Sequence, residues 1–154
     1  FVTIQHPALR CIKNTKVKIN FVTKNNWPEE VIVKHKTSSG YINVSSPEWT
    51  ALDLLANTNK FGLNRVVTVI RELASEIKVS NLAKTASKYD NIANLQRLGY
   101  ILDNVSGENK LADSLHKVLE KKKYNLVLLS PLKSRNGEID EKWRVIKNVE
   151  IFFR

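Results

Sequence analysis

The sequence of 154 residues has no methionine, one cysteine, five glycines and four prolines. A lone cysteine, Cys11, excludes an internal disulfide and a paired-cysteine zinc site, and the lack of disulfides favours a reducing compartment. No two glycines lie at the spacing of a phosphate-binding loop. The longest apolar run, residues 126–129, is far shorter than the roughly 20 residues that cross a bilayer, so we expect no membrane partner.

Methionine is missing even at position 1, where translation starts. We therefore expect Phe1 to be a processed end or the edge of a fragment, with further residues upstream. Residues 1–4 have the composition of the middle of a strand. The length fits one domain, and a domain of this size buries roughly 70% of its unfolded surface without a disulfide or metal.

Positive charge is in excess, with 25 basic and 15 acidic side chains and a formal net charge of +10. The excess lies at the two ends: residues 1–40 carry +5, residues 41–103 carry +1 and residues 104–154 carry +4. A basic domain attracts polyanions, of which nucleic acid is the commonest. A solvated surface explains the same charge, because lysine keeps small domains soluble.

The N-terminal third has the period-two alternation of strands. We predict strands over residues 16–23, 31–36 and 41–44, with a turn at residues 37–40. Together they favour an antiparallel meander that carries lysines on its solvent face. These lysines are Lys16, Lys18, Lys34 and Lys36.

The middle of the chain has apolar residues at helical spacing. A helix start is predicted at residues 45–48, with Ser45 as the cap, Pro47 in the first turn and Glu48 at capping-box spacing. Further helices are predicted over residues 63–77, 80–89, 91–104 and 108–122. The short connections between them favour a small helical bundle.

The last third predicts a buried strand over residues 124–129, a loop over 131–140 and a final strand over 143–153 with Phe153 on its apolar face. We therefore expect an α+β fold with N-terminal antiparallel strands, a central helical bundle, and a C-terminal helix and two strands that return to the sheet. No linker rich in Gly, Ser or Pro divides the chain, so residues 1–154 are expected to form a single domain.

Groups for catalysis are scarce. His6, His35 and His116 have no partners at metal-ligand spacing, and Cys11 is best explained as a small apolar filler. A magnesium-dependent nuclease needs only two carboxylates and a lysine near a strand end. The matching triplets, none of which follows a hydrophobic strand, are Glu76-Ile77-Lys78, Glu120-Lys121-Lys122 and Asp140-Glu141-Lys142. We predict no catalytic residue, metal or cofactor, and keep a nuclease as an alternative.

The basic side chains favour a function other than catalysis, namely contact with the phosphates of nucleic acid. Such contacts give salt-dependent affinity that is independent of sequence. The candidates are Lys16, Lys18, Lys34, Lys36, Lys121, Lys122, Lys123, Lys133 and Arg135. Base-specific readout needs a helix or ribbon in a groove, and we find no helix-turn-helix with recognition-helix chemistry.

Three segments resemble, in order and spacing, the AbiEi-type antitoxins of bacterial type IV toxin–antitoxin (abortive-infection) systems. They are GYINVSSPEWTALDLL at residues 40–55, QRLGYIL at 96–102, and LSPLKSRNG at 129–137 followed by KWRV at 142–145 and Asn148. The resemblance spans residues 15–154 and implies the C-terminal antitoxin domain. Family members usually carry an upstream winged helix-turn-helix that represses the operon at inverted repeats, and this domain is not part of the sequence.

The resemblance also implies roles for particular residues. Ser45, Pro47 and Glu48 build the helix start, Asp53 pairs with Arg97 to tie helices together, and Gly99 permits close packing. These roles are structural. The toxin of such systems is a nucleotidyltransferase, and its antagonism is not expected to need a stable protein complex.

The sequence therefore predicts a non-enzymatic antitoxin and transcriptional-regulator domain of a phage-defence system, located in the bacterial cytoplasm. Its partners are operator DNA, together with the missing winged helix, and the toxin. Two alternatives remain: a nucleic-acid enzyme of the magnesium-dependent nuclease type, and a protein-interaction module whose basic surface is incidental.

Overall fold

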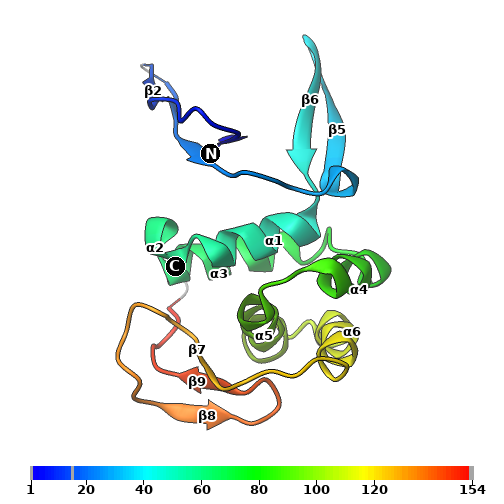
Figure 1. Cartoon of the computed structure of the whole chain (residues 1–154), viewed down its shortest axis with the longest axis vertical. Coiled ribbons are helices and arrows are strands. Elements are labelled where there is room, and N and C mark those ends of the chain that lie inside the picture. Colours follow the sequence, from blue (N-terminus) through cyan, green and yellow to red (C-terminus); the bar gives the residue numbers. More distant parts are fainter. Residues whose placement is uncertain (1, 15, 153–154) are drawn as a thin grey trace. The chain divides into compact units, whose positions relative to one another are not determined.

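Strand and helix patterns occupy different parts of the chain, and the structure follows this division (Figure 1). It is a computed structural model that describes residues 2–14 and 16–152. The chain forms two compact units, Phe1–Val44 and Ser45–Arg154. The first consists mainly of strands and the second of helices with a small sheet, so the α+β class is confirmed.

The first unit contains two pairs of short strands. β1 (Val2–Ile4) runs parallel to β4 (Phe21–Thr23), and β2 (Ile12–Lys13) runs antiparallel to β3 (Lys18–Ile19). The predicted strand over residues 16–23 is therefore divided at Asn20, because its two halves pair with different partners. The Asn20 carbonyl accepts a hydrogen bond from the Val2 amide at 2.9 Å. β4 pairs with β1 and not with the strands predicted over residues 31–36 and 41–44, so the antiparallel meander is wrong at its first strand.

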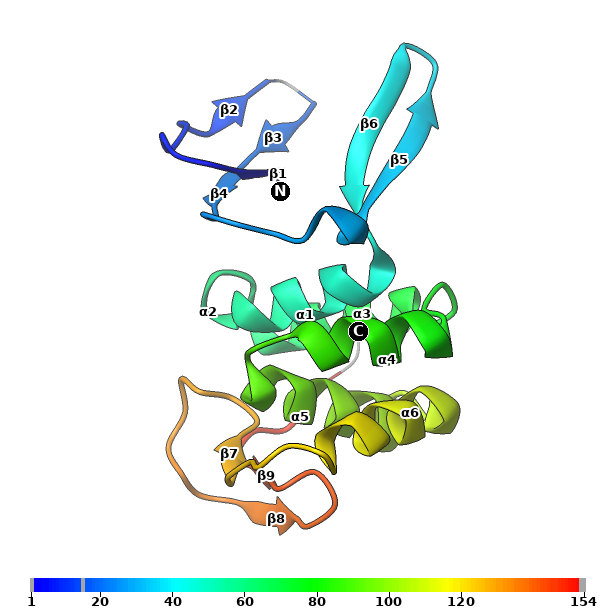
Figure 2. The same ribbon diagram turned by 45° about the vertical axis from the view of Figure 1, so that its right-hand side comes forward.

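A hairpin completes the first unit. A 3-10 helix, η1 (Glu29–Val31), leads into β5 (Ile32–Thr37), and β6 (Gly40–Ser45) returns antiparallel to it (Figure 2). Gly40 has a φ of +134°, which favours glycine at the end of the turn. The Thr37 hydroxyl donates to the Gly40 carbonyl at 3.1 Å. The second and third predicted strands are confirmed to within one residue at each end.

Six helices form the predicted bundle of the second unit. They are α1 (Pro47–Ala56), α2 (Thr58–Phe61), α3 (Leu63–Leu73), α4 (Val79–Lys88), α5 (Ile92–Tyr100) and α6 (Asn109–Leu119). Their apolar stripes form the core, in which Leu52, Val66, Ile70, Leu98 and Leu115 are fully buried. Burial of one such side chain stabilises the fold by about 1.5–3 kcal/mol.

Helix ends differ from the predictions. The helix predicted to reach residue 77 ends at Leu73, because residues 74–76 form a turn. The helix predicted over residues 91–104 changes at Tyr100 into a π-helix, η2 (Ile101–Val105). α6 ends at Leu119, three residues earlier than expected. Apolar periodicity detects these helices but does not mark where their hydrogen bonding stops.

The C-terminal strands form a sheet of their own. Its order is β7 (Val127–Leu128), β9 (Val145–Lys147), β8 (Glu138–Asp140), with β7 parallel and β8 antiparallel to β9. Three details of the prediction need correction: β8 lies within the predicted loop, β9 is shorter than the predicted final strand, and the strands do not return to the N-terminal sheet. β9 pairs with a strand of the second unit on each of its two edges. Its backbone hydrogen-bonding groups are therefore already occupied. Phe1 and Phe153 lie outside the described residues.

Candidate functional site

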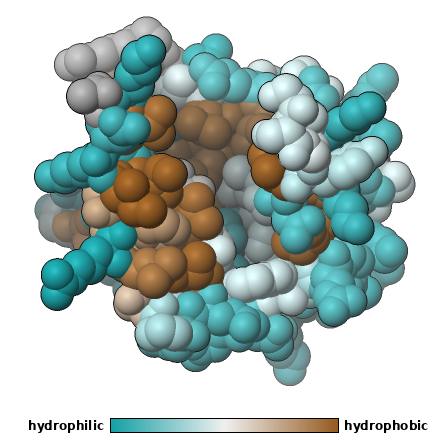
Figure 3. Space-filling view, turned by 90° about the horizontal axis from the view of Figure 1, so that it is seen from above, coloured by the Kyte–Doolittle hydropathy of each residue, from teal (hydrophilic) through white to brown (hydrophobic). Residues whose placement is uncertain are grey.

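The candidate lysines of the first unit are all exposed but lie on two separate sheets. Lys18 is on β3, with Lys16 just before that strand, whereas Lys34 and Lys36 alternate along β5 and share one face of the hairpin. The single lysine face expected from the sequence is therefore split. Large hydrophobic side chains also reach the surface, as the brown regions among teal hydrophilic ones show (Figure 3).

The lysines at the end of α6 have different environments. Lys121 and Lys123 are exposed, but Lys122 is only half-exposed. The Lys122 ammonium donates to the carbonyls of Ser87 at 3.3 Å and Tyr89 at 3.4 Å. These carbonyls flank the end of α4, where a cation satisfies orphan acceptors and interacts favourably with the helix dipole. Lys122 is thus a helix-capping contact in this structure.

The same contact brings the ends of α4 and α6 together. In the sequence, Lys88, the last residue of α4, lies between Ser87 and Tyr89, whose carbonyls accept from Lys122. Lys84, four residues before the end of α4, and Lys117, two residues before the end of α6, are exposed. We call Lys84, Lys88, Lys117, Lys121 and Lys123 the helix-end lysines. Sequence reasoning found only the last two, because the pairing of α4 with α6 joins positions more than 30 residues apart.

Lys133 and Arg135 lie in the loop between β7 and β8, and both are exposed. The loop is held by the Asn148 side chain, which accepts from the Ser130 amide at 2.9 Å. Asn148 also donates to the carbonyls of Ser130 at 2.9 Å and Ser134 at 3.0 Å. One half-buried side-chain amide thereby fixes the course of the backbone on which the two cations sit.

The start of α1 is built from the expected residues in different roles. The cap is Ser46, whose hydroxyl accepts from the Trp49 amide at 3.3 Å, and Pro47 occupies the first helical position. The Ser45 hydroxyl instead bonds that of Thr50 at 2.6 Å. Glu48 is buried and accepts from the Lys78 amide at 3.1 Å, at the start of α4. The predicted capping box is wrong because the helix starts one residue later than it requires.

Arg97 and Gly99 hold α5 against the C-terminal sheet. The Arg97 guanidinium donates to the Leu128 carbonyl and to the Asn94 side chain, both at 2.8 Å. Burial lowers the pKa of Arg97. The pairing of Arg97 with Asp53 stays a prediction. A Cβ atom added to Gly99 would overlap the Trp143 indole, so only glycine fits the present packing.

Trp143 is the centre of a polar cluster that sequence reasoning did not find. Its indole is fully buried and donates from Nε1 to Asp103 in the π-helix at 2.9 Å. Lys142 bonds Asp103 at 2.8 Å and Asp113 at 3.5 Å. Burial raises the pKa of Asp103, but the hydrogen bonds from Lys142 and Trp143 outweigh it and the pKa is lowered overall. Asp140 and Lys142, two members of a candidate nuclease triplet, both serve this cluster, since Asp140 accepts from the Trp143 amide at 2.9 Å.

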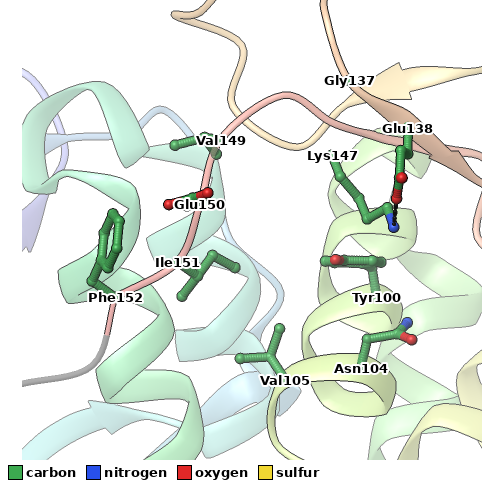
Figure 4. A pocket seen from close by; sticks show the side chains of 10 residues that line it. All are labelled: Tyr100, Asn104, Val105, Gly137, Glu138, Lys147, Val149, Glu150, Ile151 and Phe152. Atoms are coloured by element: carbon green, nitrogen blue, oxygen red, sulfur yellow. Dashed lines mark hydrogen bonds and ion pairs between the residues drawn. The ribbon is translucent and has the colours of Figure 1, made fainter.

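A pocket of about 620 Å³ opens between the π-helix and the C-terminal segment (Figure 4). Tyr100, Asn104 and Val105 line one side, and residues 149–152 line the other. The Lys147 ammonium, 2.6 Å from Glu138, also faces it. Because Glu138 neutralises this lysine and Glu150 adds a second carboxylate, the lining disfavours an anionic ligand such as a phosphate.

Across residues 2–14 and 16–152, no group of three His, Cys, Asp or Glu side chains is placed to hold a metal ion. Within the part of the chain that the structure describes, no helix has both the length and the apolar character needed to cross a membrane.

Comparison with solved structures supports the fold. The crystal structure of the RV2827C protein from Mycobacterium tuberculosis is similar, with a TM-score of 0.57 and 12% sequence identity. The match covers 83% of this chain and 48% of that one, so the chain spans about half the length of the solved relative. No curated protein matches the sequence.

Comparison with protein families identifies the family of the chain, because it compares the sequence itself. Residues 10–104 match the AbiEi antitoxin C-terminal domain. This range is more than half of the chain and includes β2–β6, the α1 start and the Arg97–Gly99 segment. The resemblance inferred from the sequence motifs is thereby confirmed, and the chain belongs to the AbiEi antitoxin C-terminal domain family.

Proposed function

We propose that this chain is the antitoxin domain of a bacterial type IV toxin–antitoxin system, where it opposes a nucleotidyltransferase toxin in the cytoplasm. The observation that carries the proposal is the family match over residues 10–104, which includes parts of both units. The toxin is a functional partner, and no stable complex with it is needed.

The second part of the proposal is a supporting role in operon repression. Exposed cations occur in both units: Lys16, Lys18, Lys34 and Lys36 in the first, and the helix-end lysines with Lys133 and Arg135 in the second. Such cations hold phosphates without reading bases. An upstream winged helix supplies the operator-specific contact, and this domain adds salt-dependent affinity.

The domain acts without catalysis. Asp140 and Lys142 of one nuclease triplet are hydrogen-bonded within the Trp143 cluster. These engagements favour structural roles for the residues that a nuclease would need. Incubation with plasmid DNA and Mg²⁺ tests this point, and cleavage that is abolished by Asp140→Ala would overturn it.

Growth rescue tests the antitoxin role. The chain is co-expressed with a type IV nucleotidyltransferase toxin in a bacterial host, with an empty vector as control. We expect the chain to restore growth, and a co-purification from the same cells to recover no stable complex. Failure to rescue at equal expression of folded protein would overturn the antitoxin proposal.

DNA binding is tested separately by titration of a duplex at several salt concentrations. Phosphate contact predicts affinity that falls linearly on a log–log plot against salt. The rival function, a protein-interaction module with an incidental basic surface, predicts no binding even at low salt. That result would remove the role in repression and leave toxin antagonism untouched.

A further inference from the structure

The β5–β6 hairpin is a ribbon that is open on both faces. Along β5, the four consecutive residues from Val33 to Lys36 are all exposed, and along β6 so are the five from Gly40 to Val44. Side chains alternate between the faces of a strand, so a consecutive run of exposed residues means that neither face is covered. Tyr41 is 68% exposed and Ile42 is 52% exposed.

An uncovered two-stranded ribbon is unusual. An isolated hairpin is at best marginally stable in water, and exposed apolar strands favour association with a partner. Val33, Ile42 and Val44 are exposed on this hairpin, whereas the hydrophobic residues of the helical unit are mostly buried. The ribbon therefore has the features of a surface that is completed by a ligand.

Charge identifies the chemistry of that ligand. Residues 31–45 contain Lys34, Lys36 and His35 and no aspartate or glutamate. The tip, Ser38-Ser39, and Asn43 on β6 add exposed groups that both donate and accept hydrogen bonds. A surface that combines cations, hydroxyls and an amide, without acids, complements a polyanion that also presents hydrogen-bonding edges.

The dimensions of the ribbon match duplex DNA. Two paired strands lie about 4.8 Å apart, and a six-residue strand is about 20 Å long. The major groove is about 12 Å wide and 8.5 Å deep and admits a two-stranded ribbon. The minor groove, at about 6 Å, is too narrow for a ribbon that carries side chains on both faces.

We infer that the β5–β6 hairpin enters the major groove of duplex DNA. Lys34 and Lys36 contact phosphates at the groove edge, while Asn43 and the Ser38-Ser39 tip face base edges. This inference rests on the proposed DNA-contacting function and adds a defined element and groove to it.

The first experiment is a binding titration of the whole chain with a fluorescent duplex of about 20 base pairs over a range of salt. The test variant is K34Q/K36Q, and the matched control is K60Q/K110Q, which removes the same charge at two exposed positions of the other unit that are not among the candidate contacts. Circular dichroism confirms that both variants are folded. For K34Q/K36Q we expect affinity at least about tenfold lower in 0.1 M salt and a log–log salt slope shallower by about 2.

The second experiment locates the groove. Dimethyl sulfate methylates guanine N7, which lies in the major groove. The wild-type chain and K60Q/K110Q are expected to protect guanines at saturating protein, and K34Q/K36Q to leave them reactive. Asn43→Ala is expected to keep the salt slope while reducing discrimination between duplex sequences.

The outcomes separate this inference from the broader proposal. If the wild-type chain binds no duplex at low salt, the DNA-contacting function and the ribbon inference both fail. If the wild-type chain binds but K34Q/K36Q weakens binding no more than K60Q/K110Q does, phosphate contact stands and the ribbon inference is overturned. Protection that is absent at N7, or concentration-dependent dimers that Ile42→Ser disperses, would likewise assign the hairpin to another partner.

Discussion

The two units differ in how much of their apolar surface is buried. Of the 26 buried hydrophobic residues among those described, 25 belong to the second unit, and Val31 is the only one in the first. Conversely, eight of the 12 exposed large hydrophobic residues lie in the first unit. Since burial drives folding, the second unit has the features of a stable scaffold and the first those of a binding surface.

The two units also differ in how their positively charged side chains are used. The first unit carries five of the ten net positive charges in less than a third of the chain, and its hairpin has no acid to pair with. In the second unit several cations are engaged: Lys122 caps α4, Lys142 bonds Asp103 and Lys147 bonds Glu138. Several cations of the second unit therefore serve packing, whereas Lys34 and Lys36 of the hairpin are exposed.

Trp143→Ala is expected to have the largest effect on this comparison. The substitution empties the space against Gly99 and leaves Asp103 without its indole donor. Loss of a buried tryptophan costs about 3–5 kcal/mol. Chemical denaturation followed by circular dichroism measures the loss. Trp143→Phe, which keeps most of the packing and removes the hydrogen bond, should lose clearly less, and equal losses would contradict a packing role.

Gln96→Leu is expected to cost about 2–3 kcal/mol. The buried Gln96 amide donates to the carbonyls of Asn125 at 2.9 Å and Trp143 at 3.0 Å, and so joins α5 to the segments that lead into β7 and β9. Leucine fills a similar volume but leaves these acceptors unsatisfied, which carries the desolvation penalty of each. The free energy of unfolding from urea titration measures it. Asn64→Leu, on the exposed face of α3, is the control and should be near neutral.

Asp103→Asn should change how stability depends on pH. The pKa of Asp103 is lowered in the folded state, so its carboxylate stabilises the protein above the unfolded pKa of about 3.9. That contribution is lost as pH falls through the folded value. The wild type should therefore lose more free energy of unfolding than Asp103→Asn as pH falls from 5 through the unfolded pKa toward the lower folded pKa. Parallel curves for the two proteins would show that the Lys142 and Trp143 contacts do not form in solution.

Helical periodicity allowed much of the scaffold to be predicted from sequence. The stripe of Val66, Val67 and Ile70 is buried as expected, because its spacing of 3.6 residues requires no knowledge of partners. Strand pairing could not be predicted in the same way. β1 pairs with β4 and β7 with β9 across long stretches of chain, and period-two alternation gives no information about which strand lies beside which.

Polar contacts between distant residues were the least predictable feature. Ser45 and Glu48 have the spacing of a capping box, yet a shift of one residue gave the cap to Ser46 and turned Glu48 toward Lys78. The bond from Trp143 to Asp103 spans 40 residues and has no local signal. For the candidate site, exposed lysines could be identified from sequence, but the capping role of Lys122 depends on the pairing of α4 with α6.

Ile42→Ser in the hairpin is expected to have the smallest effect on stability. Its side chain is 52% exposed, so the substitution removes little buried area and should change the free energy of unfolding by less than about 0.5 kcal/mol. The matched substitution Ile70→Ser, at a fully buried site in α3, should cost several times more. Both are measured by the same urea titration. A cost above about 2 kcal/mol for Ile42→Ser would show that the hairpin is covered in solution. In that case the hairpin would not be an open basic ribbon, and its inferred contact with DNA would lack the exposed surface that it requires.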